Sequence, residues 1–397
     1  PSSPAGASDP PSGDDATVAW KLVRPGRGGV IRGGEPLIAW VDLEARTVRT
    51  FARTAERGWR LHSALDRYDH EFGFRLHVAR IALARHGSPD DPEPGVRPVV
   101  VEECQTCPWW PACHPRLDEN DLSLRIDKAR LDAREIGVLA AMGISTIDEL
   151  AAADLDALLP DYLPEVGHRS GSEQRLRLAA QRAGLLVRGE QLQRTTTGAL
   201  DLPTPGWSID LDIETSVRDR VYLWGFLVND PHDPAGSDYV HFSRFAVLDE
   251  AAEHELAEQA MSWLAAQLEA HPGARVYHYS DFEVVHIRRI AVASGLPGTV
   301  RVARQYTREN FFDLFPVVRR NFFGAHGLGL KALAQYGAGF HWRDEEPGGL
   351  NSQHWFAAAV TTEDPDERSQ LRQRVLDYNE DDTRATLALR TWLWSLH

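Results

Sequence analysis

Acidic and apolar residues alternate in one short segment of the chain. Residues 208–214 read Ser-Ile-Asp-Leu-Asp-Ile-Glu, and a β-strand would place Asp210, Asp212 and Glu214 together on one face. Three neighbouring carboxylates repel one another, and aspartate is a poor strand former. A divalent cation would offset the repulsion, because carboxylate oxygens are its preferred ligands. The pattern therefore predicts a metal site, with a solvated edge strand as the alternative.

The last predicted helix carries a second acidic anomaly. Positions spaced three or four apart form a stripe that is apolar except at one aspartate: Leu371, Val375, Tyr378, Asp382, Ala385, Leu389 and Trp392. A buried carboxylate must bind a cation, shift its pKa, or pair with an arginine or a backbone amide. Tyr378 faces the same way as Asp382, one turn earlier. Glu380 and Asp381 fall off the stripe and are expected to face solvent.

Further acids follow the predicted strand 275–279. Asp281 and Glu283 lie in the first turn of the next helix, where acidic residues commonly cap the helix or interact with its dipole, and this interpretation fits Asp281. Asp313 lies inside the apolar run 311–315. A position on the surface does not readily explain an acid there.

The elements that must position these carboxylates lie after residue 195. There the pattern changes from helical to alternating, and Pro203 and Pro205 mark a domain boundary. Strands are predicted at 207–214, 221–228, 238–242 and 275–279, and helices at 249–270 and near the end of the chain. This order predicts an α/β domain over residues 205–397.

The first half of the chain has three predicted parts. Residues 1–17 are small, polar and rich in proline and glycine, which indicates a flexible leader. Short strands over 18–51 precede a helix whose apolar face runs from Trp59 to Leu76. Residues 119–200 are predicted to be helical. Within them, 136–150 resemble a helix-hairpin-helix, whose turn amides can hold a phosphate, and the alternative is a connection capped by Ser145 or Thr146.

The composition limits the class of protein. With 43% hydrophobic and 25% charged residues, and no apolar run near the ~20 residues that span a bilayer, we expect a globular cytoplasmic protein without a membrane partner. The net charge of −15 argues against nucleic-acid binding by bulk electrostatics. Any polyanion must therefore meet a local basic patch.

Three segments together resemble a known group of enzymes. Asp-Ile-Glu-Thr on the first strand, the acid after Tyr-His-Tyr-Ser, and Tyr-x-x-x-Asp on the late helix resemble the motifs of DEDD-type 3′-5′ exonucleases, in the variant with tyrosine in the third motif. The order of cysteines, helical region and C-terminal domain, over residues 97–397, resembles RecB-like nucleases with a C-terminal ribonuclease-H-like domain. One position departs from the DEDD pattern: the second motif would supply Glu283, with Asp281 as the rival, where these enzymes have aspartate.

The resemblance implies a metal-dependent 3′-5′ exonuclease acting on DNA or RNA, with a single-stranded substrate expected. Two Mg²⁺ or Mn²⁺ ions would be held by the acids of the three motifs, Asp212, Glu214, Glu283 and Asp382, and would activate water for an in-line attack that Tyr378 orients. Four basic residues are candidate phosphate contacts or ordinary ion-pair partners: Arg218, Arg220, Arg288 and Lys331. The competing class is a nucleic-acid-binding or adaptor protein that keeps the fold with an impaired site.

Cys104, Cys107 and Cys113 are the only cysteines, and their spacing indicates a metal or cluster site. They resemble three ligands of RecB-like iron–sulfur nucleases, in which a [4Fe-4S] cluster needs a fourth cysteine. A longer native chain would supply that ligand, or His114 would complete a Zn²⁺ site, or the site is empty. Residues 18–118 are interpreted as a truncated or degenerate RecB-like region, because the segment around Asp42 and Glu44 lacks the lysine that such a nuclease needs.

Overall fold

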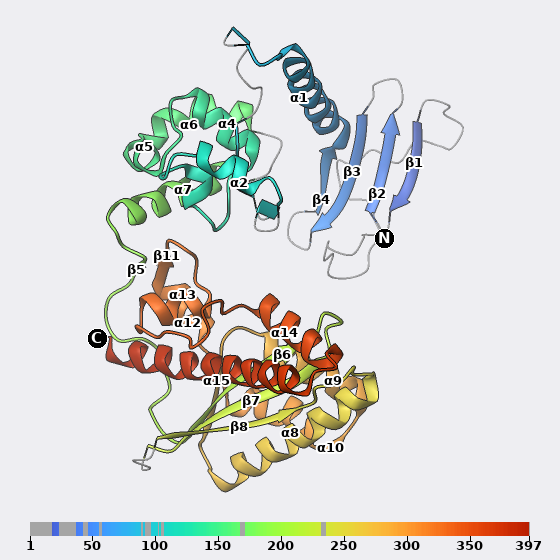
Figure 1. Cartoon of the computed structure of the whole chain (residues 1–397), viewed down its shortest axis with the longest axis vertical. Helices are drawn as coiled ribbons and strands as arrows, with labels where there is room; N and C mark the ends of the chain where they lie inside the picture. The colour runs from blue at the N-terminus through green and yellow to red at the C-terminus, as the bar shows by residue number, and fades with distance from the viewer. Residues whose placement is uncertain are drawn as a thin grey trace. The chain divides into compact units, whose positions relative to one another are not determined.

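The computed structural model describes the backbone of residues 18–23, 37–42, 47–54, 58–88, 90–91, 97–101, 103–104, 107–166, 171–231 and 236–396, and side chains in these ranges from residue 72 onward (Figure 1). The chain forms two compact units. One comprises residues 1–117, 133–138 and 159–172, and the other comprises 118–132, 139–158 and 173–397. The predicted leader 1–17 lies outside the described residues.

The first unit contains a four-stranded antiparallel sheet and a helix. The strands β1 (Val18–Val23), β2 (Leu37–Asp42), β3 (Thr47–Thr54) and β4 (Gly58–Ser63) pair in sequence order, and α1 (Ala64–Ala84) follows. The prediction that the helix begins near Trp59 is wrong, because Trp59 and Leu61 pair with Arg53 and Phe51 of β3. The segment Gly-Trp-Arg-Leu-His-Ser alternates with a period of two, which suits a strand.

The middle of the chain is helical up to residue 187 in its described parts. Its helices are α2 (Trp110–Cys113), η2 (His114–Arg116), α3 (Leu122–Arg125), α4 (Ala133–Ala141), α5 (Ile147–Ala152), α6 (Leu155–Glu165) and α7 (Ser172–Val187). The expected helical region does not continue to residue 200. Instead, β5 (Leu192–Arg194) pairs antiparallel with β11 (Phe322–Gly324), so this segment joins a sheet with the C-terminal part of the chain.

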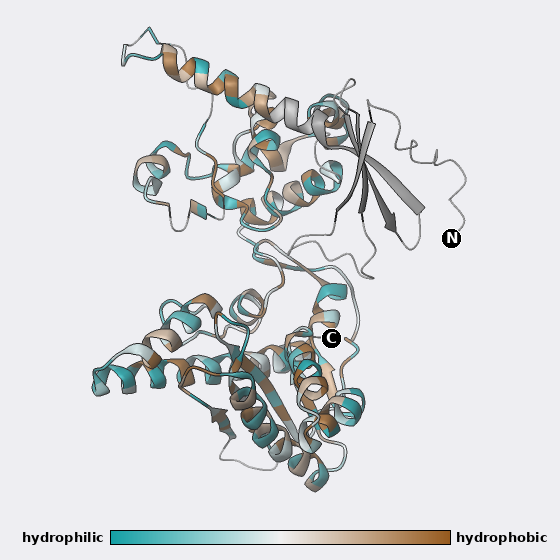
Figure 2. Cartoon of the chain, turned by 90° about the vertical axis from the view of Figure 1, so that its right-hand side faces the viewer, coloured by the Kyte–Doolittle hydropathy of each residue, from teal (hydrophilic) through white to brown (hydrophobic). Residues whose placement is uncertain are grey.

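A five-stranded mixed sheet organises the C-terminal part. Its strands are β6 (Ser208–Thr215), β7 (Val221–Asn229), β8 (Ser237–Ser243), β9 (Arg275–His278) and β10 (Phe311–Asp313), in the order β10-β9-β6-β7-β8. The first three form an antiparallel meander, and β9 and β10 run parallel to β6. β7 is buried along its first seven residues, as expected of a strand covered on both faces. In Figure 2 these strands carry apolar, brown residues.

The two faces of β6 meet different helices. The helices of this part are α8 (Glu250–Ala270), α9 (Phe282–Ser294), α10 (Pro297–Arg301), η3 (Val302–Tyr306), α11 (Thr307–Glu309), α12 (Phe315–Asn321), α13 (Leu330–Tyr336), α14 (Gly349–Thr361) and α15 (Pro365–Ser395). Ile209, Leu211 and Ile213 share one buried core with the apolar side of α8. The acidic face of β6 instead contacts α15, where Arg390 binds Asp210 and Asn379 binds Asp212.

The ends of the long helices follow from local sequence. Asp249 accepts a hydrogen bond from the Ala252 amide at the start of α8, and Asp364 accepts from the amides of Asp366 and Glu367 at the start of α15. These aspartates satisfy amide groups that have no partner within the helix. The predicted start of the first helix at residue 249 is therefore confirmed to within one residue.

Candidate metal centre

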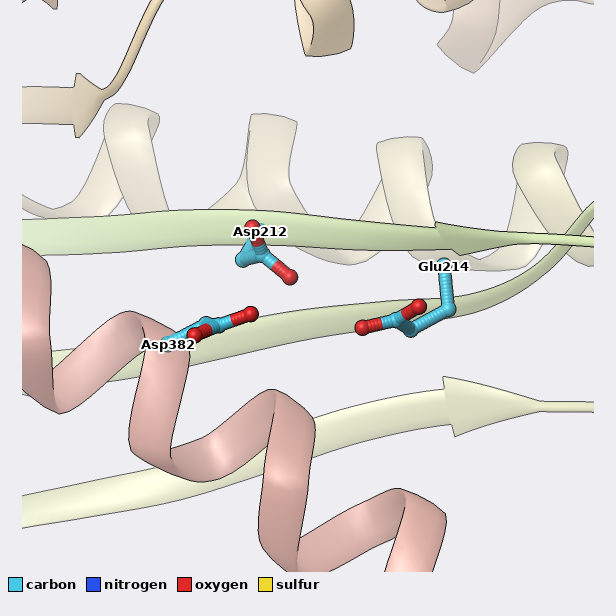
Figure 3. Close-up of side chains that lie close together, drawn as sticks. All are labelled: Asp212, Glu214 and Asp382. Carbon is cyan, nitrogen blue, oxygen red and sulfur yellow. The ribbon is translucent and has the colours of Figure 1, made fainter. Parts of the chain in front are cut away.

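Three carboxylates from two elements meet at the acidic face of β6. Each of Asp212, Glu214 and Asp382 offers an oxygen, and these three oxygens all lie within 4.8 Å of one another. Figure 3 shows the side chains pointing toward a common centre, two from β6 and one from α15. The period of two places Asp212 and Glu214 on the same face of β6, and the packing of α15 brings Asp382 beside them.

Each carboxylate accepts a hydrogen bond from an uncharged donor. The Asn379 amide donates to Asp212 Oδ2 over 2.6 Å, and the Ser352 hydroxyl donates to Glu214 Oε2 over 2.6 Å. The Trp342 indole donates to Asp382 Oδ1 over 2.7 Å. These donors orient the carboxylates without neutralising them. The arrangement therefore suits a divalent cation, which supplies the missing charge and prefers oxygen ligands.

Burial and mutual repulsion raise the pKa values of this group. Burial, followed by the charge of Asp382, raises the pKa of Glu214 to about 8. Burial and the charges of Asp382, Glu214 and Glu283 raise the pKa of Asp212 well above its ordinary value. Burial also raises the pKa of Asp382, against the opposing effects of Lys331 and the Trp342 hydrogen bond. The ionised cluster is thus unfavourable without a cation.

A comparison with known protein families gives a match that covers nearly all of the five-stranded sheet and α15. Residues 210–394 match the model of the RNase_H superfamily. Residues 210–394 form a ribonuclease-H-like domain. No curated protein and no solved structure gives a significant match to the chain.

Glu283 and Asp281, the two candidates predicted for the second motif, have different surroundings in the structure. Glu283 is buried on α9, and its Oε2 lies 3.6 Å from His278 Nδ1, which is within ion-pair distance when the imidazole is protonated but too far for a hydrogen bond. That nitrogen lies instead 2.6 Å from the Ser280 carbonyl oxygen. Glu283 Oε2 is therefore a buried oxygen with no hydrogen-bond partner among the described residues. Burial raises the pKa of Glu283, and its charge reaches Asp212, although it is not one of the three oxygens that cluster within 4.8 Å.

Asp281 is exposed, and the expectation that it caps the helix is wrong. It occupies the N-cap position of α9, but its side chain makes no capping hydrogen bond. Its φ of −91° and ψ of 3° differ from the extended backbone with which N-cap side chains reach the next amides. Asp313 acts locally in this region, because its Oδ1 accepts hydrogen bonds from the amides of Ser280 and Phe315.

Lys331 and Tyr378 form a pair beside the cluster. Lys331 Nζ on α13 donates to the Tyr378 hydroxyl over 2.8 Å and lies 4.6 Å from the centre of that ring. Burial lowers the pKa of Lys331, while the charges of Asp382, Glu214 and Asp212 raise it. Burial and the same carboxylates raise the pKa of Tyr378, so the phenol keeps its proton. Among the four basic candidates, Lys331 is thus the one placed at the carboxylates.

The three candidate arginines have different surroundings. Arg220 donates to the buried Glu253 over 2.7 Å. Of its two predicted roles, phosphate contact or ion-pair partner, Arg220 therefore has the second. Arg218 and Arg288 are exposed, and neither forms a salt bridge within the part of the chain that the structure describes. They stay predicted phosphate contacts.

Asp210 has a structural partner instead of a metal. Arg390 donates to both of its oxygens over 2.8 Å, and Asn229 donates to Oδ2 over 2.8 Å. Arg390 is itself 3% exposed and lies over the ring of Tyr277. The bidentate pair offsets the charge of Asp210, so only two of the three acids on this face remain for a cation.

We expect Arg390→Met to destabilise the domain by about 3–5 kcal/mol, because it leaves a buried carboxylate unpaired. Arg384→Met is the matched control on the same helix: Arg384 forms a partly exposed ion pair with Glu380, whose loss costs about 0–1 kcal/mol. Urea denaturation measures both free energies of unfolding. Equal losses in the two variants would contradict the structural role of Arg390.

Several residues at the site were not predicted from sequence. Asn379 lies beside Tyr378 on α15 but off its apolar stripe, and it is fully buried. Asp381, expected in solvent, is 3% exposed and binds the Arg343 backbone amide and guanidinium. Ser352 and Trp342 come from α14 and the preceding loop, and no local pattern marks them.

The cysteine and hairpin predictions have separate outcomes. Cys104, Cys107 and Cys113 are free and partly exposed, and no described set of three ligand atoms within 4.8 Å contains their sulfurs. A cluster or Zn²⁺ there stays a prediction. The helix-hairpin-helix is not confirmed: Glu149 Oε2 accepts from the amides of Ser145 and Thr146, and the Thr146 hydroxyl accepts from the Glu149 amide. This capping box occupies the amides that a phosphate would need.

Among the described residues, no helix combines the length and apolar character required to cross a bilayer.

Proposed function

We propose that the ribonuclease-H-like domain is a metal-dependent nuclease, acting as a 3′-5′ exonuclease on single-stranded DNA or RNA. The observation that carries the proposal is the cluster of Asp212, Glu214 and Asp382, whose oxygens lie within 4.8 Å of one another. Its hydrogen-bond donors are uncharged, which favours a cation as the missing partner. Glu283, with a buried oxygen that lacks a hydrogen bond, is proposed as the fourth ligand.

The residues around the cluster would act on the substrate in distinct ways. Two Mg²⁺ or Mn²⁺ ions, when bound, would supply an activated water and stabilise the leaving oxygen. Tyr378 accepts a hydrogen bond from Lys331 and is itself hydrogen-bonded to Asp382, so its hydroxyl would orient the attacking water beside that ligand. Lys331 would attract a substrate phosphate, since the protein as a whole is strongly acidic.

Labelled substrates test the reaction and its direction. We expect 5′-labelled single-stranded DNA or RNA, incubated with Mg²⁺ or Mn²⁺, to give a ladder of products shortened from the 3′ end. EDTA should stop the reaction, because the carboxylates alone cannot activate water. Immediate release of a labelled mononucleotide would show the opposite direction. No product from either polymer with either metal would favour the adaptor function.

The raised pKa values predict how metal stabilisation depends on pH. A carboxyl whose pKa rises on folding binds its proton more tightly in the native state, so the metal-free protein loses stability as pH rises. For Glu214 this loss extends from its ordinary value of 4.5 to about 8. A cation binds the deprotonated carboxylates, so we expect the increase in Tm with Mg²⁺ to be larger at pH 8 than at pH 6. Calorimetry at both values measures it, and the Asp382→Asn variant should show a smaller difference.

A further inference from the structure

A buried amide connects the metal centre to the edge of the sheet. Asn379 is fully buried on α15, and its Nδ2 donates to Asp212 Oδ2 over 2.6 Å. On its other side, Asn379 Oδ1 accepts a hydrogen bond from the Tyr239 hydroxyl of β8, also over 2.6 Å. One side chain thus joins three elements: β6, β8 and α15.

The chemistry of the two partners fixes the orientation of this amide. An ionised Asp212 only accepts hydrogen bonds, so it requires the NH₂ end of Asn379. With the NH₂ end directed at Asp212, the carbonyl end faces Tyr239, whose hydroxyl donates to it over 2.6 Å. Turning the amide around would place its oxygen against the carboxylate.

The backbone opposite Asp212 leaves room for the amide. Gly225 of β7 pairs with Asp212 in the sheet register. A Cβ at Gly225 would lie 1.7 Å from Asn379 Oδ1 and 3.0 Å from the Tyr239 hydroxyl. Glycine weakens the interior of a strand and often marks a close approach by another group. Here the approaching group is the side chain that holds Asp212.

We propose that Asn379 is a positioning residue, which fixes Asp212 through one oxygen so that the other stays directed at a divalent cation. Tyr239 sets the orientation of Asn379, and Gly225 provides its space. This inference rests on the proposed metal-dependent function. Groups that orient a metal ligand in this way contribute to metal affinity without touching the metal.

The affinity for Mn²⁺ in the absence of nucleic acid tests the proposal. We expect Asn379→Ala to raise the Kd for Mn²⁺ about 10- to 100-fold, the range for partners that orient metal ligands. Asn229→Ala is the matched control. Asn229 donates the same kind of amide hydrogen bond, over 2.8 Å, to Oδ2 of Asp210, which lies on β6 like Asp212 but is not one of the clustered carboxylates. Its Kd should equal that of the unmodified protein. Electron paramagnetic resonance of free Mn²⁺ measures all three.

Three further variants separate positioning from a general loss of folding. Tyr239→Phe removes a single hydroxyl and should weaken Mn²⁺ binding in the same direction, with circular dichroism unchanged. Gly225→Ala should also weaken binding, but Gly225→Ala combined with Asn379→Ala should bind no worse than Asn379→Ala alone, because the clashing amide is gone. Such non-additivity is expected only of residues that share a contact.

The outcomes distinguish this inference from the proposed function. If the unmodified protein binds Mn²⁺ and both Asn379→Ala and Tyr239→Phe bind it equally well, the positioning role is overturned and the metal centre stands. If the unmodified protein binds no Mn²⁺, the metal centre and the positioning role are both overturned. Should Asn379→Ala not fold, Tyr239→Phe and the Asn229→Ala control still decide the question.

Discussion

Replacing Asp212 or Asp382 by asparagine is expected to abolish nuclease activity while leaving the fold intact. Each substitution removes the negative charge of one of the three carboxylates whose oxygens meet within 4.8 Å. A bound metal supplies several kcal/mol of charge stabilisation in the transition state, and each 1.36 kcal/mol is tenfold in rate. We therefore expect turnover to fall by at least about 1,000-fold. Single-turnover degradation of the labelled strand at saturating Mn²⁺ measures the loss.

The stability of these variants provides an internal control. Because burial and neighbouring charges raise the pKa values of both aspartates, ionising them opposes folding in the absence of metal. The metal-free Asp212→Asn and Asp382→Asn proteins should therefore unfold at the same temperature as the unmodified protein, or higher. Inactive variants that have also unfolded would carry no information on catalysis. Folded variants with full activity would rule out the proposed ligands.

Glu283→Gln is expected to lower turnover on the order of 100-fold, comparable to removing one electrostatic stabiliser from an active site. Glu283 is buried, and its Oε2 has no hydrogen bond to any described group. His278 Nδ1, 3.6 Å away, is its one ionic partner among the described residues, and a divalent cation would offset the charge more completely. Glutamine keeps the shape of the side chain and removes its charge, so the rate at saturating Mn²⁺ reports the charge.

Asp281→Asn is the matched comparison two residues away. Asp281 is exposed and caps nothing in the described structure, so we expect the substitution to leave both turnover and the unfolding temperature unchanged. The two rates, measured side by side, decide which acid belongs to the second motif. A larger loss in Asp281→Asn than in Glu283→Gln would move the ligand to the exposed position.

Much of the C-terminal domain follows from local sequence. Alternation placed the three acids of β6 on one face, and the spacing along α15 identified Asp382 on a buried stripe. These patterns are strong because a strand and a helix repeat every 2.0 and 3.6 residues, so the face of each side chain follows from its position. The order of predicted strands and helices also indicates the α/β class.

The partners of the acids could not be predicted in the same way. Asp210 and Asp212 look equivalent in sequence, yet Arg390 neutralises one and the uncharged Asn379 binds the other. These partners lie more than 160 residues away, and only the packing of α15 on β6 selects between the two acids. Trp59 and Leu61 gave a similar difficulty. Their spacing is compatible with the start of a helix, and it is the pairing with β3 that makes the segment a strand.

The separation of Asp212 from Asp382 has a consequence for the time at which the site can form. The ribosome adds 170 further residues after Asp212 before it reaches Asp382, which at about 5–20 residues per second takes roughly 10–30 seconds. During that interval the nascent chain carries Asp212 and Glu214 but not Asp382, the third carboxylate of the cluster. A message interrupted anywhere upstream of the codon for Asp382 would therefore yield a product without the complete carboxylate cluster, however well its first strands had formed.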